Sequence, residues 1–276
     1  STYVGWAWKG GGAPTADNSA GAGATPTSGS VKIDGANLGS ALAGTIAATR
    51  LSANTAAGFS IISFTGDGNA GATVGHGLSQ APEMWITKSR SATGFWYAGN
   101  VNYSSPAGNY YQHLSLDVAQ ASNTGIWNGT LPSSTVITLG NLSSYQNVSS
   151  TTYISYAFHS VEGYSKVGSF TGNNDAANNV FIYTGFKPAF LLVKNITTAG
   201  QYWTIWDNKR DPYNMSNHIL EPNDTRVESN VSNNTSVDLL SNGFRPKNNN
   251  NQCGGGPTLF LYYAVASSPF KTSNAR

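Results

Sequence analysis

The chain has 276 residues, only 10% of them charged, and a net charge of +2 with acids and bases scattered along it. This distribution offers no basic stripe for phosphates, which argues against a nucleic-acid partner, and the sequence lacks the apolar run of about 18 residues that would predict membrane insertion. Hydrophobic residues at 39% and aromatic residues at 12% are sufficient for a folded core, and together with many glycines and asparagines they favour an all-β protein rich in turns.

Residues 1–9 (Ser-Thr-Tyr-Val-Gly-Trp-Ala-Trp-Lys) read as a complete strand. We expect them to be the closing strand of a preceding unit, so that the chain is a processed fragment or a piece cut from a longer protein. Residues 10–57 are rich in Gly, Ala, Ser and Thr. This composition is typical of a linker or an extended arm, and it leaves open whether the segment is ordered.

An internal repeat covers the remainder of the chain. The motif at 58–66 (Gly-Phe-Ser-Ile-Ile-Ser-Phe-Thr-Gly) returns at 163–172 with one residue inserted, and further matches follow in the same order. The matched pairs include 80–88 with 186–194, 136–140 with 237–241, and 152–158 with 259–265. A unit of about 105 residues has the length of a whole β-sandwich. The sequence therefore predicts two tandem antiparallel, jelly-roll-like β-sandwich repeats, at 58–162 and 163–276, after an extended N-terminal segment.

Helix is expected at most in one place, Ser115–Ala121, with a weak parallel at His218–Glu221. The Asp/Asn loops at 67–69 and 173–175 occupy matching places in the two repeats. Calcium would need about six oxygen ligands, more than these loops offer, so we predict plain turns there.

Few residues suggest catalysis. The four histidines lie outside any His-Glu-x-x-His pattern, and the single cysteine, Cys253, lies in a turn-like Asn-Gln-Cys-Gly-Gly-Gly context. No Gly-x-Ser-x-Gly nucleophile motif occurs either. The sequence therefore predicts no catalytic residue, no metal ligand and no cofactor, and a chain that is not an enzyme. Asp207 and Asp211 are the remaining pair that could serve glycoside hydrolysis, although an Asp–Arg ion pair is the simpler interpretation.

One stretch has the composition of a sugar platform, in which a ring stacks on an aromatic side chain while amides and carboxylates bind hydroxyl groups. The alternative is that its tryptophans belong to the core, as large aromatic residues in strands usually do. The candidate ligand-binding residues are Trp203, Trp206, Asp207, Arg210, Asp211 and Tyr213, with Trp96 from the matching aromatic pair of the first repeat.

Several of these motifs resemble a domain found in large structural proteins of marine bacteriophages. The resemblance rests on 58–66, on 72–90 (Ala-Thr-Val-Gly-His-Gly-Leu-Ser-Gln-Ala-Pro-Glu-Met-Trp-Ile-Thr-Lys-Ser-Arg), on Arg-Asp-Pro-Tyr-Asn at 210–214 and on Leu-Ser-Asn-Gly-Phe at 240–244. It covers residues 58–276, and the opening residues resemble the exit of a preceding lectin-like domain. The family carries no catalytic residues that could be transferred.

The resemblance implies a virion-surface, extracellular protein, such as a tail-fibre or tailspike segment that contacts host surface glycans. A head-decoration, fibre-spacer or surface-filament protein without a ligand is the alternative, and a polysaccharide depolymerase is the third. The implied partners are further copies of the chain, with a homotrimer favoured, other virion proteins, and host cell-surface carbohydrate. The ligand, the host and the choice between fibre and capsid stay open at this point.

Overall fold

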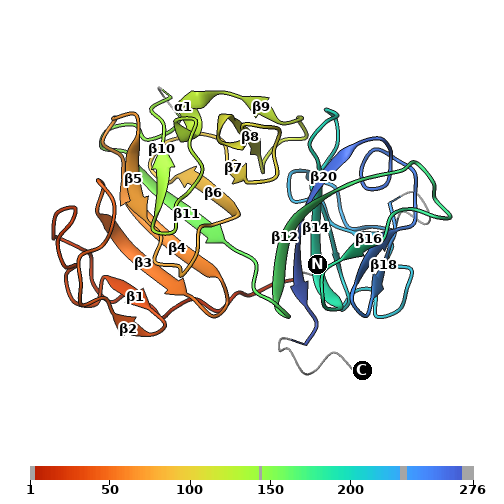
Figure 1. Cartoon of the computed structure of the whole chain (residues 1–276), viewed down its shortest axis with the longest axis horizontal. Helices are drawn as coiled ribbons and strands as arrows, with labels where there is room; N and C mark the ends of the chain where they lie inside the picture. The colour runs from red at the N-terminus through yellow and green to blue at the C-terminus, as the bar shows by residue number, and fades with distance from the viewer. Residues whose placement is uncertain (1–3, 143–144, 231–234, 269–276) are drawn as a thin grey trace. The chain divides into compact units, whose positions relative to one another are not determined.

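The computed structural model describes residues 4–142, 145–230 and 235–268. Over these residues the fold is all-β, as predicted, with short strands, the helical turn α1 (Thr124–Trp127) and the 3-10 turn η1 (Ala107–Asn109) (Figure 1). The chain divides into two compact units. Unit 1 consists of the residues up to Gly94 together with Thr124–His159, and unit 2 consists of Phe95–Asn123 together with the residues from Ser160 onward.

The main sheet of unit 1 has the strand order β2-β1-β3-β4-β11-β6. Its neighbours are antiparallel except for the parallel pair β1–β3. A second sheet pairs β5 with β10. The strands are β1 (Val31–Ile33), β2 (Ala36–Asn37), β3 (Ala48–Asn54), β4 (Phe59–Thr65), β5 (Ala72–Gly75), β6 (Met84–Ser89), β10 (Val136–Leu139) and β11 (Thr152–Phe158).

Aromatic pairs form the core of unit 1. Phe64 and Tyr153 lie opposite each other on β4 and β11, and their rings stack at 5.3 Å. Trp85 on β6 meets Trp127 of α1 edge to face at 5.3 Å, and both are fully buried. Such ring pairs add about 0.5–1.5 kcal/mol beyond the area that they bury. Buried and more exposed side chains alternate along β4. One face of this strand therefore packs in the core, and the other face is accessible.

Unit 2 contains the sheet β12-β20-β14-β15 and a smaller sheet, β13-β19-β18. One core cluster joins Phe170, Leu191, Trp206 and Tyr262 of the first sheet with Phe244 of the second. The strands are β7 (Tyr97–Asn100), β8 (Tyr110–His113), β9 (Ala121–Ser122), β12 (Ser165–Thr171), β13 (Ile182–Tyr183), β14 (Pro188–Asn195), β15 (Thr204–Asp207), β16 (His218–Ile219), β17 (Ser229–Asn230), β18 (Val237–Leu240), β19 (Gly243–Pro246) and β20 (Leu259–Ala266).

The two units share part of their strand order, since β4-β11-β6 corresponds to β12-β20-β14. The segments matched in the predicted repeat, 136–140 and 237–241, each form an antiparallel pair: β10 pairs with β5, and β18 pairs with β19. Their equivalence stays a prediction.

The sequence predicted a linker or an extended arm at residues 10–57 and left open whether the segment is ordered, whereas the structure shows strands there. Residues 10–57 contain β1, β2 and β3, and β3 pairs with β4 from Asn54↔Phe59 to Ala48↔Phe64. Leu51 and Ala53 are fully buried, because small and apolar side chains on one face of β3 complete the core. Residues 4–9 form no regular strand, and residues 1–3 lie outside the described residues.

The prediction of a helix at Ser115–Ala121 is wrong, because this segment is turn and irregular structure that leads into β9. The weak helical parallel at His218–Glu221 is wrong as well, because His218–Ile219 is strand β16. The predicted boundary between 162 and 163 lies near the observed one between His159 and Ser160. Phe95–Asn123, however, groups with unit 2, although it was predicted to belong to the first repeat. The described part of the chain contains no helix that is long and apolar enough to cross a membrane.

Candidate functional site

The predicted sugar platform is centred on β15 in unit 2, where all four strand residues are buried. The Trp206 side chain is fully buried, and its Nε1 donates to the carbonyl of Thr235 at 3.0 Å. Trp203 is 4% exposed, and its Nε1 donates to the carbonyl of His113 at 2.9 Å. Both tryptophans are therefore core residues, as the alternative interpretation proposed, and neither offers a ring face to a sugar.

The carboxylates of this stretch have structural partners. Asp207 accepts the backbone N–H groups of Lys209 and Arg210, and its Oδ2 lies 2.5 Å from Arg210 Nε. Asp211 accepts the backbone N–H of Asn217 at 2.7 Å and pairs with His218 Nδ1 at 2.5 Å. Asp207 thus forms the Asp–Arg pair that the sequence suggested, and both carboxylates hold loops in place.

The other predicted residues are placed differently. The Tyr213 side chain is 84% exposed. Trp96 is partly buried in unit 2, and its carbonyl accepts the backbone N–H of Leu114. The structure consequently does not assemble the predicted residues into one exposed aromatic surface.

The loops considered for calcium are irregular segments in which the Asp carboxylates accept hydrogen bonds from neighbouring groups. Asp67 accepts the N–H of Asn69 and the amide of Asn147, both at 2.9 Å. Burial acts to raise the pKa of Asp67, but these hydrogen bonds outweigh it and lower the pKa. Asp175 accepts the backbone N–H groups of Asn178 and Ala177, which lower its pKa. Within the described ranges, no three His, Cys, Asp or Glu side chains gather as metal ligands.

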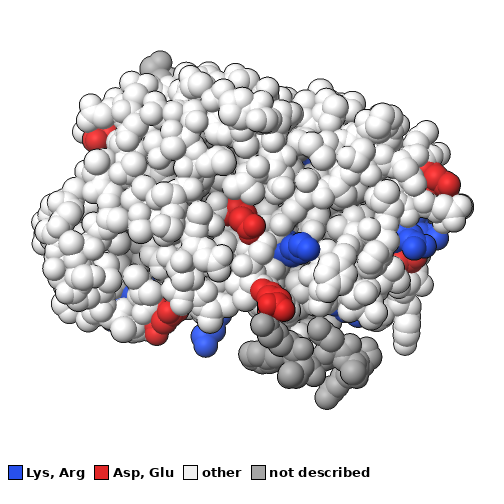
Figure 2. Space-filling model, in the orientation of Figure 1, with Lys and Arg blue, Asp and Glu red and all other residues white. Residues whose placement is uncertain are grey.

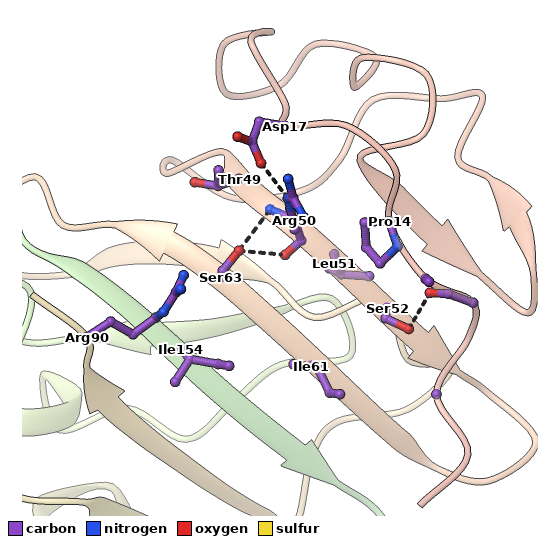
Figure 3. Close-up of a pocket in the computed structure, with 13 residues that line it drawn as sticks. Pro14, Asp17, Thr49, Arg50, Leu51, Ser52, Ile61, Ser63, Arg90 and Ile154 are labelled. Carbon is purple, nitrogen blue, oxygen red and sulfur yellow. Dashed lines mark hydrogen bonds and ion pairs between the residues drawn. The ribbon is translucent and has the colours of Figure 1, made fainter.

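A cavity of about 820 Å³ in unit 1 lies on the outer face of the main sheet. We call it the arginine cleft and define it by Asp17, Arg50, Ile61, Ser63, Arg90 and Ile154, with the segment Gly10–Pro14 along one side. Figure 3 shows Ser63 between the side chains of Arg50 and Arg90, with the two isoleucines along the strands.

The strand register explains why these residues meet. Arg50 on β3 is paired with Ser63 on β4, and Ser63 is paired with Ile154 on β11. Side chains that are directly opposite on neighbouring strands point to the same face of a sheet. Arg90 follows β6, and its N–H donates to the carbonyl of Thr152 at 2.7 Å, which continues the β11–β6 ladder. The sheet therefore presents one arginine from each side of an apolar strip.

Close backbone approach fixes the wall of the cleft. Ser52 Oγ donates to the carbonyl of Gly12 at 2.7 Å, and the N–H of Gly35 donates to the carbonyl of Gly11 at 2.7 Å. A Cβ at Gly11 would lie 1.7 Å from the carbonyl oxygen of Ala53. Glycine is thus required where the segment crosses β3.

The cleft contains more positive than negative side chains. Arg50 Nε pairs with Asp17, and the side chains are 50% and 66% exposed, so that solvent screens this pair. Arg90 is exposed and has no ion-pair partner among residues 4–142, 145–230 and 235–268. Two arginines and one aspartate leave the cleft with a surplus positive charge beside the partly buried Ile61 and Ile154.

This arrangement suits binding of an anionic group. Guanidinium groups bind carboxylate, sulfate or phosphate through paired hydrogen bonds. Asp17 is the one carboxylate among the lining residues, and it is engaged by Arg50. The cleft therefore lacks the two facing carboxylates of glycoside hydrolysis.

The sequence prediction missed this cleft because Asp17 and Arg50 lie in the segment assigned to a linker. The sequence does contain a strand pattern at 50–53, where polar Arg50 and Ser52 alternate with apolar Leu51 and Ala53 as in a half-buried strand. Arg90 was noted only as the end of a motif, and nothing in the sequence joined it to Arg50.

The chain belongs to a protein family described as a domain of unknown function (DUF7483), whose model matches residues 1–269. Neither the curated proteins nor the solved structures contain a match to the chain. This description names no function, and the resemblance to bacteriophage virion proteins stays a prediction.

Proposed function

We propose that this chain is a non-enzymatic part of a bacteriophage virion surface that binds host surface glycans, and that the arginine cleft holds an acidic saccharide. The observation that carries the ligand assignment is Arg90, an exposed cation without an ion-pair partner among the described residues, on the same sheet face as Arg50 and beside an apolar strip. The bacteriophage assignment is supported by the sequence resemblance alone.

The chemistry of the lining residues matches the parts of an acidic sugar. A carboxylate would bind the guanidinium of Arg90, and the apolar face of the ring would pack on Ile61 and Ile154. Ser63 lies opposite Ile154 and between the two arginines (Figure 3). Its Oγ accepts the backbone N–H of Arg50 at 3.1 Å and donates to the Arg50 carbonyl at 3.3 Å, which leaves one lone pair to accept from a sugar hydroxyl. Because the cleft is open to solvent, salt should weaken this binding by screening the charges.

The remaining surface is consistent with an extracellular structural role. Charged residues are only 10% of the chain, and on the face shown in Figure 2 they are few and lie mostly in small groups of mixed sign. Uncharged side chains form the rest of this surface, including exposed hydrophobic residues such as Phe181 and Val227, which suits contacts with other virion proteins. Self-association, with a homotrimer favoured, belongs to the same proposal.

A ligand-free structural role is the second candidate, as a head-decoration, spacer or surface-filament protein. The burial of Trp203 and Trp206 favours it, because a spacer has no reason to expose aromatic rings. The two candidates differ in whether the arginine cleft binds anything.

Two experiments test the proposal. Immunogold labelling of purified virions with an antibody against this chain should place label on fibres or the tail tip. Label spread over the capsid would favour the decoration role, and no label at all would reject the bacteriophage assignment. Calorimetric titration with trigalacturonic acid, with neutral galactotriose as its matched control, should show saturable binding of the acidic sugar only. Absence of binding at low salt would reject the cleft as a saccharide site.

A further inference from the structure

A second hollow lies in unit 2, along β12 and β13, with a volume of about 470 Å³. We call it the tyrosine groove and define it by Asn102, Lys166, Ser169, Phe181, Tyr183 and Tyr262. None of these residues was singled out from the sequence. The groove differs from the arginine cleft because aromatic and amide side chains line it and Lys166 is its one cation.

Two aromatic rings are exposed at this groove. Tyr183 is 59% exposed and Phe181 is 41% exposed. Side chains of this size normally bury about 150–250 Å² each, so that leaving them in water forgoes stability. Neighbouring exposed aromatic rings beside a hollow are typical of a binding surface.

Both rings are held in place. Lys166 Nζ donates to the carbonyl of Tyr183 at 3.1 Å and lies 5.4 Å from the centre of its ring. A Cβ at Gly243 would lie 2.8 Å from the ring of Phe181, so this ring rests directly on the backbone of β19. The aromatic surface therefore exists before any ligand arrives, which reduces the entropy lost on binding.

The base of the groove is aromatic as well. Gly168 on β12 is paired with Tyr262 on β20, and a Cβ at Gly168 would lie 2.6 Å from the Tyr262 ring. The Tyr262 ring therefore occupies the space that a side chain at position 168 would take. The rim is polar: Ser169 is exposed, and its Oγ lies 3.5 Å from Oδ1 of Asn102. The groove thus offers rings on one side and uncharged hydrogen-bonding groups on the other.

We infer that the tyrosine groove is a second saccharide site, which takes a neutral hexopyranose whose apolar face stacks on Tyr183 and Phe181. A neutral ligand is favoured because the single cation, Lys166, is already engaged with Tyr183 and no carboxylate lines the groove. Asn102 and Ser169 would bind ring hydroxyl groups. This inference rests on the proposed carbohydrate-binding role for its ligand class, but it does not depend on the arginine cleft.

The test is saturation-transfer NMR and titration of the whole chain with maltohexaose, cellohexaose and mannohexaose as probes. At least one probe should bind with a dissociation constant of about 1 mM or below. Tyr183→Ala should weaken that binding at least about tenfold, equivalent to about 1.4 kcal/mol, whereas Tyr183→Phe should retain it. Tyr213→Ala is the matched control, because it removes an exposed tyrosine of the same unit outside the groove.

Three results would overturn the inference: no saturable binding of any probe, binding that Tyr183→Ala leaves unchanged, or equal weakening by Tyr213→Ala. An unchanged urea midpoint for Tyr183→Ala would show that a loss of binding is not a loss of folding. Failure of the acidic sugar to bind, with neutral binding intact, would reject the arginine cleft alone. Arg90→Gln should leave neutral binding unchanged, because Arg90 belongs to unit 1.

Discussion

Replacing Trp206 with alanine separates a core role from a binding role for the tryptophans of β15. The Trp206 side chain is fully buried in the core cluster of unit 2. Truncating a buried tryptophan to alanine costs about 3–5 kcal/mol. The change also removes the donor to the carbonyl of Thr235, which adds about 1 kcal/mol or more. Because whole domains are stable by only about 5–15 kcal/mol, the variant should keep little of its stability.

Urea unfolding followed by circular dichroism measures this effect, with a fit that allows the two units to unfold separately. The Trp206→Ala midpoint should fall sharply, while Tyr213→Ala should stay within about 0.5 kcal/mol of the unaltered chain. An unchanged midpoint for Trp206→Ala would refute the reasoning. It would mean that the ring is not a core element and would revive the platform interpretation.

Two further predictions concern buried titratable groups. Burial lowers the pKa of His76 to about 4, from about 6.5 in the unfolded chain, so the stability that it contributes above pH 6.5 should be lost as the pH falls to 4, by up to about 3 kcal/mol. Urea midpoints across this range should fall less steeply for His76→Gln, and equal slopes would contradict the prediction. Burial raises the pKa of the Cys253 thiol, so native protein should resist a thiol reagent and react only on unfolding; rapid native labelling would contradict its place in the core.

The predicted strands at the repeat motifs are observed because their alternation is strong. In 59–65 the buried apolar residues are Phe59, Ile62 and Phe64, and in 152–158 Tyr153 and Ala157 are buried in the same core. The all-β class was therefore predictable from composition and pattern.

Other features depend on tertiary contacts that local sequence does not encode. Ala48 and Ala53 are poor strand formers, yet both are fully buried because β3 completes the sheet beside β4. Whether Trp203 and Trp206 face solvent or the core depended on the carbonyls that their indole N–H groups meet, and those lie 90 and 29 residues away. The arginine cleft likewise needs the register of four strands.

The most direct test of the proposed function compares Arg90→Gln with Lys209→Gln in titrations with trigalacturonic acid at low salt. Both variants remove one exposed positive charge, but only Arg90 lines the cleft. Arg90→Gln should weaken binding about fivefold to tenfold, equivalent to about 1 kcal/mol, and Lys209→Gln should leave it unchanged. Equal weakening by both variants would show that only the overall charge matters, and unchanged binding in Arg90→Gln would show that the sugar is not held in the arginine cleft.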